Sequence, residues 1–168
     1  MRNKAPHIFL VGFMGCGKST VGPVLADKLG LPFIDNDQVI EARVASTIAD
    51  LIAREGEPRF REIETESLRQ AASSSGAVIA LGGGAFTQEI NRQIIAESGL
   101  SVWLDAPFEL CWKRITEDTT VRPLAPNEET ARARYASRLE IYKLADLHIA
   151  VDENQTAKEI AEMILSRR

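Results

Sequence analysis

A glycine-rich stretch near the start of the chain has the residue types that cradle phosphate. Residues 12–20 read GFMGCGKST and satisfy the pattern G-x-x-x-x-G-K-[ST], between an apolar run and a stretch with helical spacing. Glycines let backbone N–H groups close around phosphate oxygens, Lys18 adds positive charge over the β- and γ-phosphates, and the Ser19 hydroxyl can bind Mg²⁺. The stretch therefore predicts a nucleoside triphosphate site. The residues expected to form it are Gly12, Gly15, Cys16, Gly17, Lys18, Ser19 and Thr20. Cys16 fills a variable position, so we expect no catalytic role for it.

A pair of carboxylates follows the second apolar run, in the sequence FIDND at residues 33–37. Side chains two positions apart on a strand point to the same face, so Asp35 and Asp37 could reach one site. If the strand is parallel to its neighbours, its carboxyl end lies near the phosphate loop. One acid could then help to hold Mg²⁺ while the other accepts a proton from an attacking hydroxyl. The alternative is that Asp37 only caps the helix that begins at Gln38.

Two more stretches could recognise a phosphoryl acceptor. In PRFREIE, at residues 58–64, Arg59 and Arg61 offer planar forks that suit a carboxylate, although the stretch read alone favours ion pairs on an exposed helix face. Three glycines, Gly82 to Gly84, follow a strongly apolar run. A tight turn needs only one or two, so three favour a close approach of a ligand to the backbone over a purely conformational role.

The elements that must position these residues follow an alternating pattern. Short apolar runs at residues 8–11, 33–34, 77–81, 100–104 and 147–151 are each followed by a stretch with helical spacing. This order predicts βα units and a mostly parallel sheet. Pro107 suits the first turn of a helix, and Thr156 with Glu159 forms a possible capping box for a C-terminal helix.

Two segments depart from that pattern. Residues 48–75 are charged and helix-prone, with a turn signal at residues 55–58, and they read as an insert between the second and third strands. Residues 116–127 are polar, contain two prolines and lack an apolar period, so they predict a loop. Loops of this length inside compact domains often serve as lids or binding elements.

The composition narrows the class of protein. The chain has 168 residues, of which 45% are hydrophobic and 26% charged, which predicts one globular domain spanning residues 1–168. A net charge of −4 argues against a nucleic-acid partner, which would normally require a basic face. Two distant cysteines indicate a reducing, cytoplasmic setting, and the apolar runs are too short for a signal peptide or a membrane span.

Taken in order, the motifs resemble those of shikimate kinases. Residues 12–20 resemble the family's phosphate loop, residues 33–37 its F-x-D-x-D segment, residues 56–64 its G-E-x-x-F-R-x-x-E stretch, residues 82–84 its triple glycine and residues 122–124 its R-P-L lid motif. Arg138 and Tyr142 resemble residues of the helix after the lid. The resemblance implies a three-layer α/β P-loop kinase fold with a five-stranded parallel sheet, in the order 2-3-1-4-5, between helices. It also implies a substrate-binding insert at residues 37–75 and a mobile lid at residues 116–127.

The resemblance implies a role for each matching residue. Asp37 matches the acid that contacts the shikimate hydroxyl and is the usual candidate base, and Asp35 matches the acid near the magnesium site. Arg61 and Arg138 match the pair that grips the shikimate carboxylate, while Gly82, Gly83 and Gly84 supply backbone contacts to the same substrate.

On the nucleotide side, Arg122 matches the lid arginine that swings over the transferring phosphate, with Lys18 as the other cation. Arg114 matches the arginine that lies against adenine, and Asn154 and Gln155 fall in the second adenine-contacting loop. The implied reaction is transfer of the γ-phosphoryl group of ATP to the 3-hydroxyl of shikimate, with Mg²⁺, in aromatic amino acid biosynthesis, by a cytoplasmic monomer.

Three other functions could use parts of this pattern, and the sequence departs from the family pattern at two places. A kinase of another hydroxy acid, such as gluconate, would share the fold. An effector-sensing module and a nucleic-acid-remodelling ATPase are disfavoured by the acidic charge and the intact set of catalytic residues. The family often has a glycine and a serine before the isoleucine of the insert, where this chain has Ala45 to Ile48. Its R-P-L-L lid motif ends here in Ala125. We expect the first departure to affect a turn and the second to affect lid packing. Both should change how fast the reaction runs more than whether it occurs.

Overall fold

A parallel sheet of five strands forms the centre of the computed structural model, which describes residues 6–119 and 124–168. The strands are β1 (His7–Val11), β2 (Phe33–Asp35), β3 (Val78–Ala80), β4 (Gly99–Asp105) and β5 (Leu147–Ala150). They pair in the order β2-β3-β1-β4-β5, and every pairing is parallel. The expected sheet and strand order are therefore confirmed, with strand ends that differ by at most one residue from those expected.

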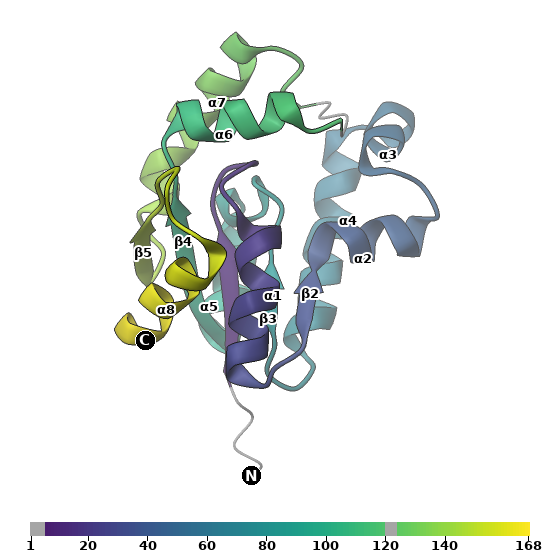
Figure 1. The fold of residues 1–168 in the computed structure, drawn as a ribbon. Coiled ribbons are helices and arrows are strands. Elements are labelled where there is room, and N and C mark those ends of the chain that lie inside the picture. The colour runs from purple at the N-terminus through teal and green to yellow at the C-terminus, as the bar shows by residue number, and fades with distance from the viewer. Residues whose placement is uncertain (1–5, 120–123) are drawn as a thin grey trace.

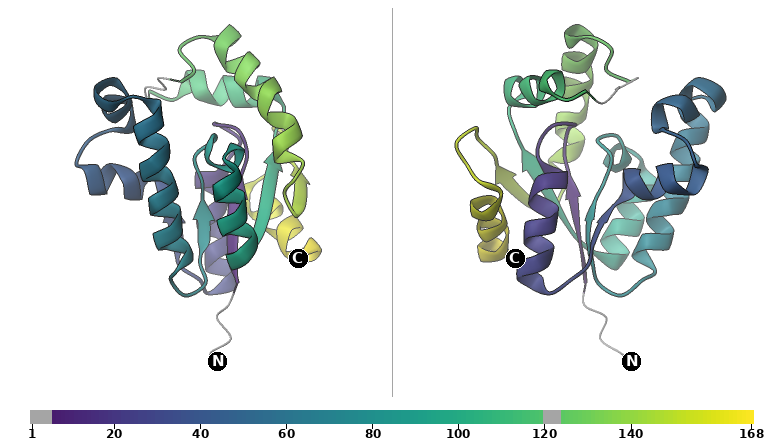
Figure 2. Two further views of the ribbon diagram at one scale, coloured as in Figure 1. Left: turned by 180° about the vertical axis from the view of Figure 1, so that it is seen from behind. Right: turned by 45° about the vertical axis from the view of Figure 1, so that its right-hand side comes forward.

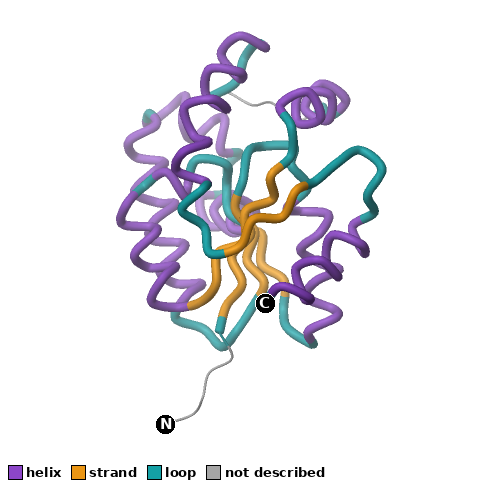
Figure 3. The backbone as a smooth tube through the Cα atoms, turned by 90° about the vertical axis from the view of Figure 1, so that its left-hand side faces the viewer, coloured by secondary structure: helices purple, strands orange, loops and turns teal. Residues whose placement is uncertain are grey.

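Helices cover both faces of the sheet, as parallel strands require. The helical elements are α1 (Lys18–Leu29), α2 (Asn36–Val44), α3 (Ile48–Glu55), α4 (Glu57–Ala72), the short 3₁₀ helix η1 (Ala85–Thr87), α5 (Glu89–Ser98), α6 (Phe108–Glu117), α7 (Glu128–Tyr142) and α8 (Ala157–Arg167). Helices α1 and α8 lie in front of the sheet in Figure 1, and α4, α5 and α7 lie on its other side (Figure 2). Figure 3 shows the strands passing between these two helical layers.

The largest group of buried apolar side chains surrounds the central strands. All five residues of β1 are buried, and β3 is buried throughout. These strands read as continuous apolar runs because helices cover them from both sides. Strand β1 leads directly into the phosphate loop, so a completely buried strand positions that loop.

A second, smaller apolar cluster lies within the insert. It consists of Ile40, Leu51, Phe60 and Ile63, which come from α2, α3 and α4. The expected turn is confirmed at Gly56, whose φ of 86° lies in the region that favours glycine. The helices of the insert therefore share a core of their own, and they carry one wall of the candidate site with them.

Three local expectations were corrected by the structure. The loop expected at residues 116–127 begins later, because α6 continues to Glu117. The Thr116 hydroxyl donates hydrogen bonds to the carbonyls of Trp112 and Lys113, which lets this polar residue stay helical. Pro107 is the N-cap of α6 and not part of its first turn. The third concerns α2, which begins at Asn36 and not at Gln38.

The last helix, α8, begins with the hydrogen-bonded cap expected from the sequence. Thr156 and Glu159 form the expected capping box, with each side chain accepting a hydrogen bond from the other residue's backbone N–H. No helix in the described part of the chain is long and apolar enough to cross a membrane.

Candidate active site

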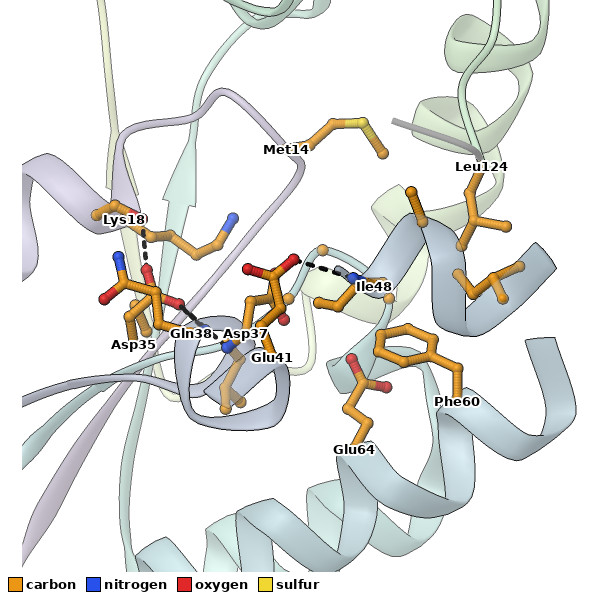
Figure 4. Close-up of a pocket in the computed structure, with 18 of the residues that line it drawn as sticks. Met14, Lys18, Asp35, Asp37, Gln38, Glu41, Ile48, Phe60, Glu64 and Leu124 are labelled. Carbon is orange, nitrogen blue, oxygen red and sulfur yellow. Dashed lines mark hydrogen bonds between the residues drawn. The ribbon is translucent and has the colours of Figure 1, made fainter. Parts of the chain in front are cut away.

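The motifs gather around a cavity at the carboxyl ends of β1, β2 and β3. Its volume is about 810 Å³. The phosphate loop, α2, α3, α4 and the triple glycine line it, with Arg138 from α7 and Leu124 near the loop after α6. Figure 4 shows Lys18 and Asp35 on one side of this cavity, with Phe60 and Glu64 on the other. The topology therefore joins segments that are distant in sequence, in the place where open α/β sheets bind ligands.

The phosphate loop depends on glycine at three positions. Gly12, Gly15 and Gly17 have φ values of 138°, 77° and 107°, which lie in the region that favours glycine. The Lys18 ammonium donates hydrogen bonds to the carbonyl oxygens of Gly12 and Phe13, at 2.8 and 3.0 Å. The lysine thus folds over its own loop. Its flexible chain allows it to exchange these carbonyls for phosphate oxygens.

Asp35 connects the phosphate loop to α2. Its Oδ2 accepts a hydrogen bond from the Ser19 hydroxyl at 3.0 Å, while Oδ1 accepts from the backbone N–H groups of Asp37 and Gln38. Asp35 is therefore the N-cap of α2, and the suggestion that Asp37 caps this helix was wrong. The helix begins two residues earlier than expected, which makes Asp37 a residue of its first turn.

Ser19 and Asp35 have the chemistry of a magnesium site. They present a hydroxyl and a carboxylate oxygen at 3.0 Å from each other. Mg²⁺ prefers such hard oxygen ligands and usually takes the remainder from water and substrate phosphates. The described residues contain no cluster of three or more metal-binding side chains, which such a shared site does not need.

Asp37 and Glu64 meet beside Gly82. A methyl group on Gly82 would lie 2.8 Å from Asp37 Oδ1 and 3.0 Å from Glu64 Oε1. Burial of Glu64 raises the pKa of its carboxyl to about 7, against the opposing effect of Arg61 and with a further increase from Asp37. Glu64 Oε1 has no hydrogen-bond partner among the described residues. This side of the cavity thus contains a buried carboxyl oxygen whose hydrogen-bonding capacity is not used by the described residues.

Arg61 faces the cavity, and its neighbour Arg59 faces solvent. The Arg61 side chain is 14% exposed and donates to Glu57 Oε1 at 3.0 Å and Glu64 Oε2 at 2.8 Å. Burial lowers the pKa of its guanidinium, but these two acids outweigh that effect and raise it overall. Arg59 is 52% exposed and pairs with Glu62. The exposed-face interpretation is therefore right for Arg59 and wrong for Arg61.

Arg138 reaches the same place from α7. It is 6% exposed, its Nη1 has no hydrogen-bond partner among the described residues, and its guanidinium lies 5.8 Å from the centre of the Phe13 ring. A buried guanidinium with a free N–H is well suited to an anion. The structure therefore brings Arg61 and Arg138 together beside the glycines.

The triple glycine is surrounded by the charged groups of the site. A methyl group on Gly83 would lie 3.4 Å from Arg138 Nη1, and one on Gly84 would lie 2.7 Å from Arg61 Cζ. None of the three glycines has a positive φ, so a purely conformational role was the wrong alternative. Glycine is required at these positions because charged side chains already occupy the space that a larger residue would need. Tyr142 adds to this contact by donating its hydroxyl hydrogen to the Gly83 carbonyl.

The residues expected around adenine are only partly brought together. Arg114 Nη1 donates to the Gly15 carbonyl at 3.1 Å, so it lies beside the phosphate loop. Asn154 and Gln155 lie in the loop after β5, where the Asp152 carboxylate and backbone fix both through hydrogen bonds. These three residues do not line the cavity described above. Arg122 lies outside the described residues.

Two side chains were given no role by the sequence, although they belong to the site. Glu57 and Glu64 both hold Arg61. The signal was present in the helical spacing, because residues 57, 61 and 64 share one face of a helix. What the spacing does not reveal is that this face is buried.

Comparisons with known proteins agree on one family. The model of the family described as shikimate kinase matches residues 14–167. A shikimate kinase of Cereibacter sphaeroides is 42% identical over 166 residues, covering 95% of this chain and 83% of the relative. One of Nostoc punctiforme is 42% identical over 162 residues, covering 95% and 88%.

Among solved structures, this chain is similar to shikimate kinases, and less so to a kinase with another substrate name. The structure of a shikimate kinase from Acinetobacter baumannii in complex with shikimate has a TM-score of 0.89 and 38% identity, over 96% of this chain and 92% of that one. A gluconokinase from Sinorhizobium meliloti reaches a TM-score of 0.63 at 20% identity, over 98% and 92%. The second likeness concerns the fold alone.

Proposed function

The chain belongs to the shikimate kinase family, and from that premise we propose that it transfers the γ-phosphoryl group of ATP to the 3-hydroxyl of shikimate. The products are shikimate 3-phosphate and ADP. The observation that carries the proposal is the position of two guanidiniums, from Arg61 and Arg138, and the Asp37 carboxylate around the triple glycine, next to a phosphate loop. Such a site suits an acceptor that has both a carboxylate and a hydroxyl.

Recognition of the acceptor follows from these charges. Arg61 and Arg138 bind the carboxylate of shikimate from two sides, because a guanidinium offers a planar set of donors that matches a carboxylate. The backbone of Gly82, Gly83 and Gly84 contacts the ring and its hydroxyls. This leaves the 3-hydroxyl directed toward Asp37 and the phosphate loop.

The chemical step requires mainly positioning and charge. The transition state of phosphoryl transfer is loose and spreads its charge over the phosphoryl oxygens, so little covalent help is needed. Lys18 and Arg122 stabilise that charge, and Asp37 orients the attacking hydroxyl and takes its proton. The backbone N–H groups of residues 12–20 hold the phosphates, while Arg114, Asn154 and Gln155 contact adenine.

Ser19 and Asp35 hold Mg²⁺ in this proposal. When bound, the ion neutralises charge on the β- and γ-phosphates of ATP. Asp35 keeps its orientation because two backbone N–H groups of α2 fix its other oxygen. The insert at residues 37–75 and the lid at residues 116–127 close over the substrates and exclude water, which limits hydrolysis of ATP. We further propose that the chain works as a cytoplasmic monomer.

The proposal is tested by measuring ADP release with a panel of acceptors. Shikimate, quinate, gluconate and nucleoside monophosphates are each supplied with ATP and Mg²⁺. We expect turnover with shikimate to exceed that with gluconate and with nucleoside monophosphates, because these acceptors lack the combination of ring hydroxyls and a carboxylate. The absence of shikimate-dependent ADP release would refute the proposal, and faster release with gluconate would support the sugar-acid alternative.

A further inference from the structure

Arg134 of α7 lies one helical turn before Arg138, and it contacts the other side of the site. Its Nη2 is 4.0 Å from Oε2 of Glu57, the first residue of α4. Glu57 uses its other oxygen to accept a hydrogen bond from Arg61 at 3.0 Å. One carboxylate therefore lies between a guanidinium on α4 and a guanidinium on α7.

The two helices reach the site from different parts of the fold. Helix α4 belongs to the insert, whereas α7 follows the loop after α6. The view from behind shows α5 between their lower parts (Figure 2, left). Within the described residues, the contact between Glu57 and Arg134 is the only ion pair that joins α4 to α7. It therefore bridges the two walls that hold Arg61 and Arg138.

The contact forms an outer layer over the buried arginines. The side chains of Glu57 and Arg134 are 38% and 31% exposed, against 14% for Arg61. Arg138 is almost completely buried. An anion that enters the cavity meets the inner pair, while Glu57 and Arg134 remain at the edge.

The charges explain what Arg134 would do there. Arg61 already has two acidic partners, Glu57 and Glu64, and both compete with a substrate carboxylate for its N–H groups. Arg134 attracts one of these competitors. Without Arg134, the negative charge of Glu57 would act on Arg61 alone. This charge would offset more of the positive charge of the Arg61 guanidinium and would pull the guanidinium away from Gly84.

We propose that Arg134 is a positioning residue for the acceptor carboxylate, which acts through Glu57 to keep Arg61 beside Gly84 and to hold α4 against α7. The inference rests on the proposed function, since it assigns Arg134 to the carboxylate subsite. The effect is modest, because a partly exposed pair at this distance is a weak one. We expect Arg134→Leu to raise the KM for shikimate by about two- to five-fold.

The first test compares three variants by steady-state kinetics. In Arg134→Leu, the KM for shikimate rises while kcat and the KM for ATP stay within about 1.5-fold of the wild type, a limit below the expected pair effect. Arg134→Lys keeps the charge and recovers part of the loss. Arg132→Leu is the matched control, because Arg132 lies on the same helix, is 51% exposed and pairs with Glu109 and Glu128. If both leucine variants raise the KM equally, general charge is responsible and the inference is wrong.

The second test asks whether Glu57 mediates the effect. In a double-mutant cycle, Arg134→Leu should change the KM for shikimate much less when Glu57→Gln is already present. Additive effects would refute the bridge. A rise in the KM values for both substrates, together with a lower melting temperature, would assign Arg134 a role in folding. If the wild type turns over shikimate and Arg134→Leu has the same KM for shikimate, only this inference is refuted. If the wild type does not turn over shikimate, the proposed function is refuted as well.

Discussion

At the scale of single residues, Asp35 and Asp37 illustrate how neighbouring acids acquire different surroundings. Asp35 is fixed by the Ser19 hydroxyl and by two backbone N–H groups at the start of α2. Asp37 belongs to the first turn of that helix and lies against Gly82, on the side of the cavity where the arginines gather. The helix cap therefore holds one acid near the phosphate loop, and the other lies at the subsite proposed for the acceptor.

Replacing Asp37 by asparagine tests this division. We expect Asp37→Asn to lower kcat by at least about 100-fold, which is the scale of a lost acid–base contribution. The affinity for ATP should hardly change, because the phosphate loop is intact. Single-turnover kinetics and nucleotide titrations measure the two effects separately. A kcat close to that of the wild type would remove Asp37 from the chemistry.

Glu64 shows what burial does to a carboxyl group. Its side chain is completely buried and one oxygen has no partner among the described residues, so the charged form is disfavoured and the pKa rises to about 7. In the unfolded chain the same group titrates near its ordinary value of 4.5. Between these two values the folded protein keeps a proton that the unfolded chain has lost.

Glu64 should therefore make the protein less stable as the pH rises through that window. Because the folded state binds more protons there, the free energy of unfolding falls from about pH 4.5 to about pH 7 and then levels off. Glu64→Gln lacks this contribution, so its stability relative to the wild type should increase with pH over the same range. Urea denaturation at several pH values gives the comparison. Parallel pH profiles for the two proteins would contradict the expected burial effect.

At the scale of elements, the turn between α2 and α3 has an unusual residue at its centre. Ala45 ends α2 with a φ of 51°, and it is the only non-glycine residue with positive φ in the described chain. The turn is held from within, because Glu41 Oε1 accepts a hydrogen bond from the backbone N–H of Ile48. A positive φ is unfavourable for a residue with a Cβ atom, so the alanine imposes strain on the start of the insert.

Glycine at this position should stabilise the protein. Ala45→Gly removes a steric cost of about 1–2 kcal/mol and adds a smaller entropic cost in the unfolded chain. We expect a net gain of up to about 1 kcal/mol, or about 2–4 °C in melting temperature. Ala42→Gly is the matched control, because Ala42 is exposed within α2 and its replacement should cost about 1 kcal/mol. Equal destabilisation by both changes would mean that Ala45 is not strained.

At the scale of the whole molecule, the fold separates two binding tasks that the reaction must join. The loop between β1 and α1 carries the residues proposed to bind phosphate, whereas α4, α7 and the glycines after β3 carry those proposed to bind the acceptor. The insert has an apolar cluster of its own in addition to its contacts with the rest of the fold. Damage to one subsite should therefore leave binding at the other nearly intact.

Thermal shifts can test this separation without catalysis. A ligand present at about 100 times its Kd adds about 2.7 kcal/mol to the stability of the folded state, or about 5–10 °C for a protein of this size. We expect Mg²⁺ with ADP and shikimate each to raise the melting temperature of the wild type. Arg61→Ala should lose most of the shift with shikimate and keep the shift with nucleotide. An equal loss of both would show that Arg61 supports the fold.

The sequence alone determined the features that depend on short-range pattern. The phosphate loop, the alternation of strands and helices, the turn at Gly56 and the capping box at Thr156 each follow from residues within a few positions of one another. Local chemistry decides such features, because only a few residue types suit a backbone with positive φ or can cap the end of a helix. The order of the strands came from the family resemblance and was confirmed by the structure.

The tertiary structure decided which face of each element looks into the site. It made Asp35 the cap of α2, turned Arg61 inward and Arg59 outward, and placed the charged groups against the three glycines. It also joined Glu57 to Arg134 across two helices. Helical spacing indicates which residues share a face, but burial of that face depends on contacts with elements far away in the sequence. For this reason the residue types of the site could be predicted from the sequence, whereas their partners required the fold.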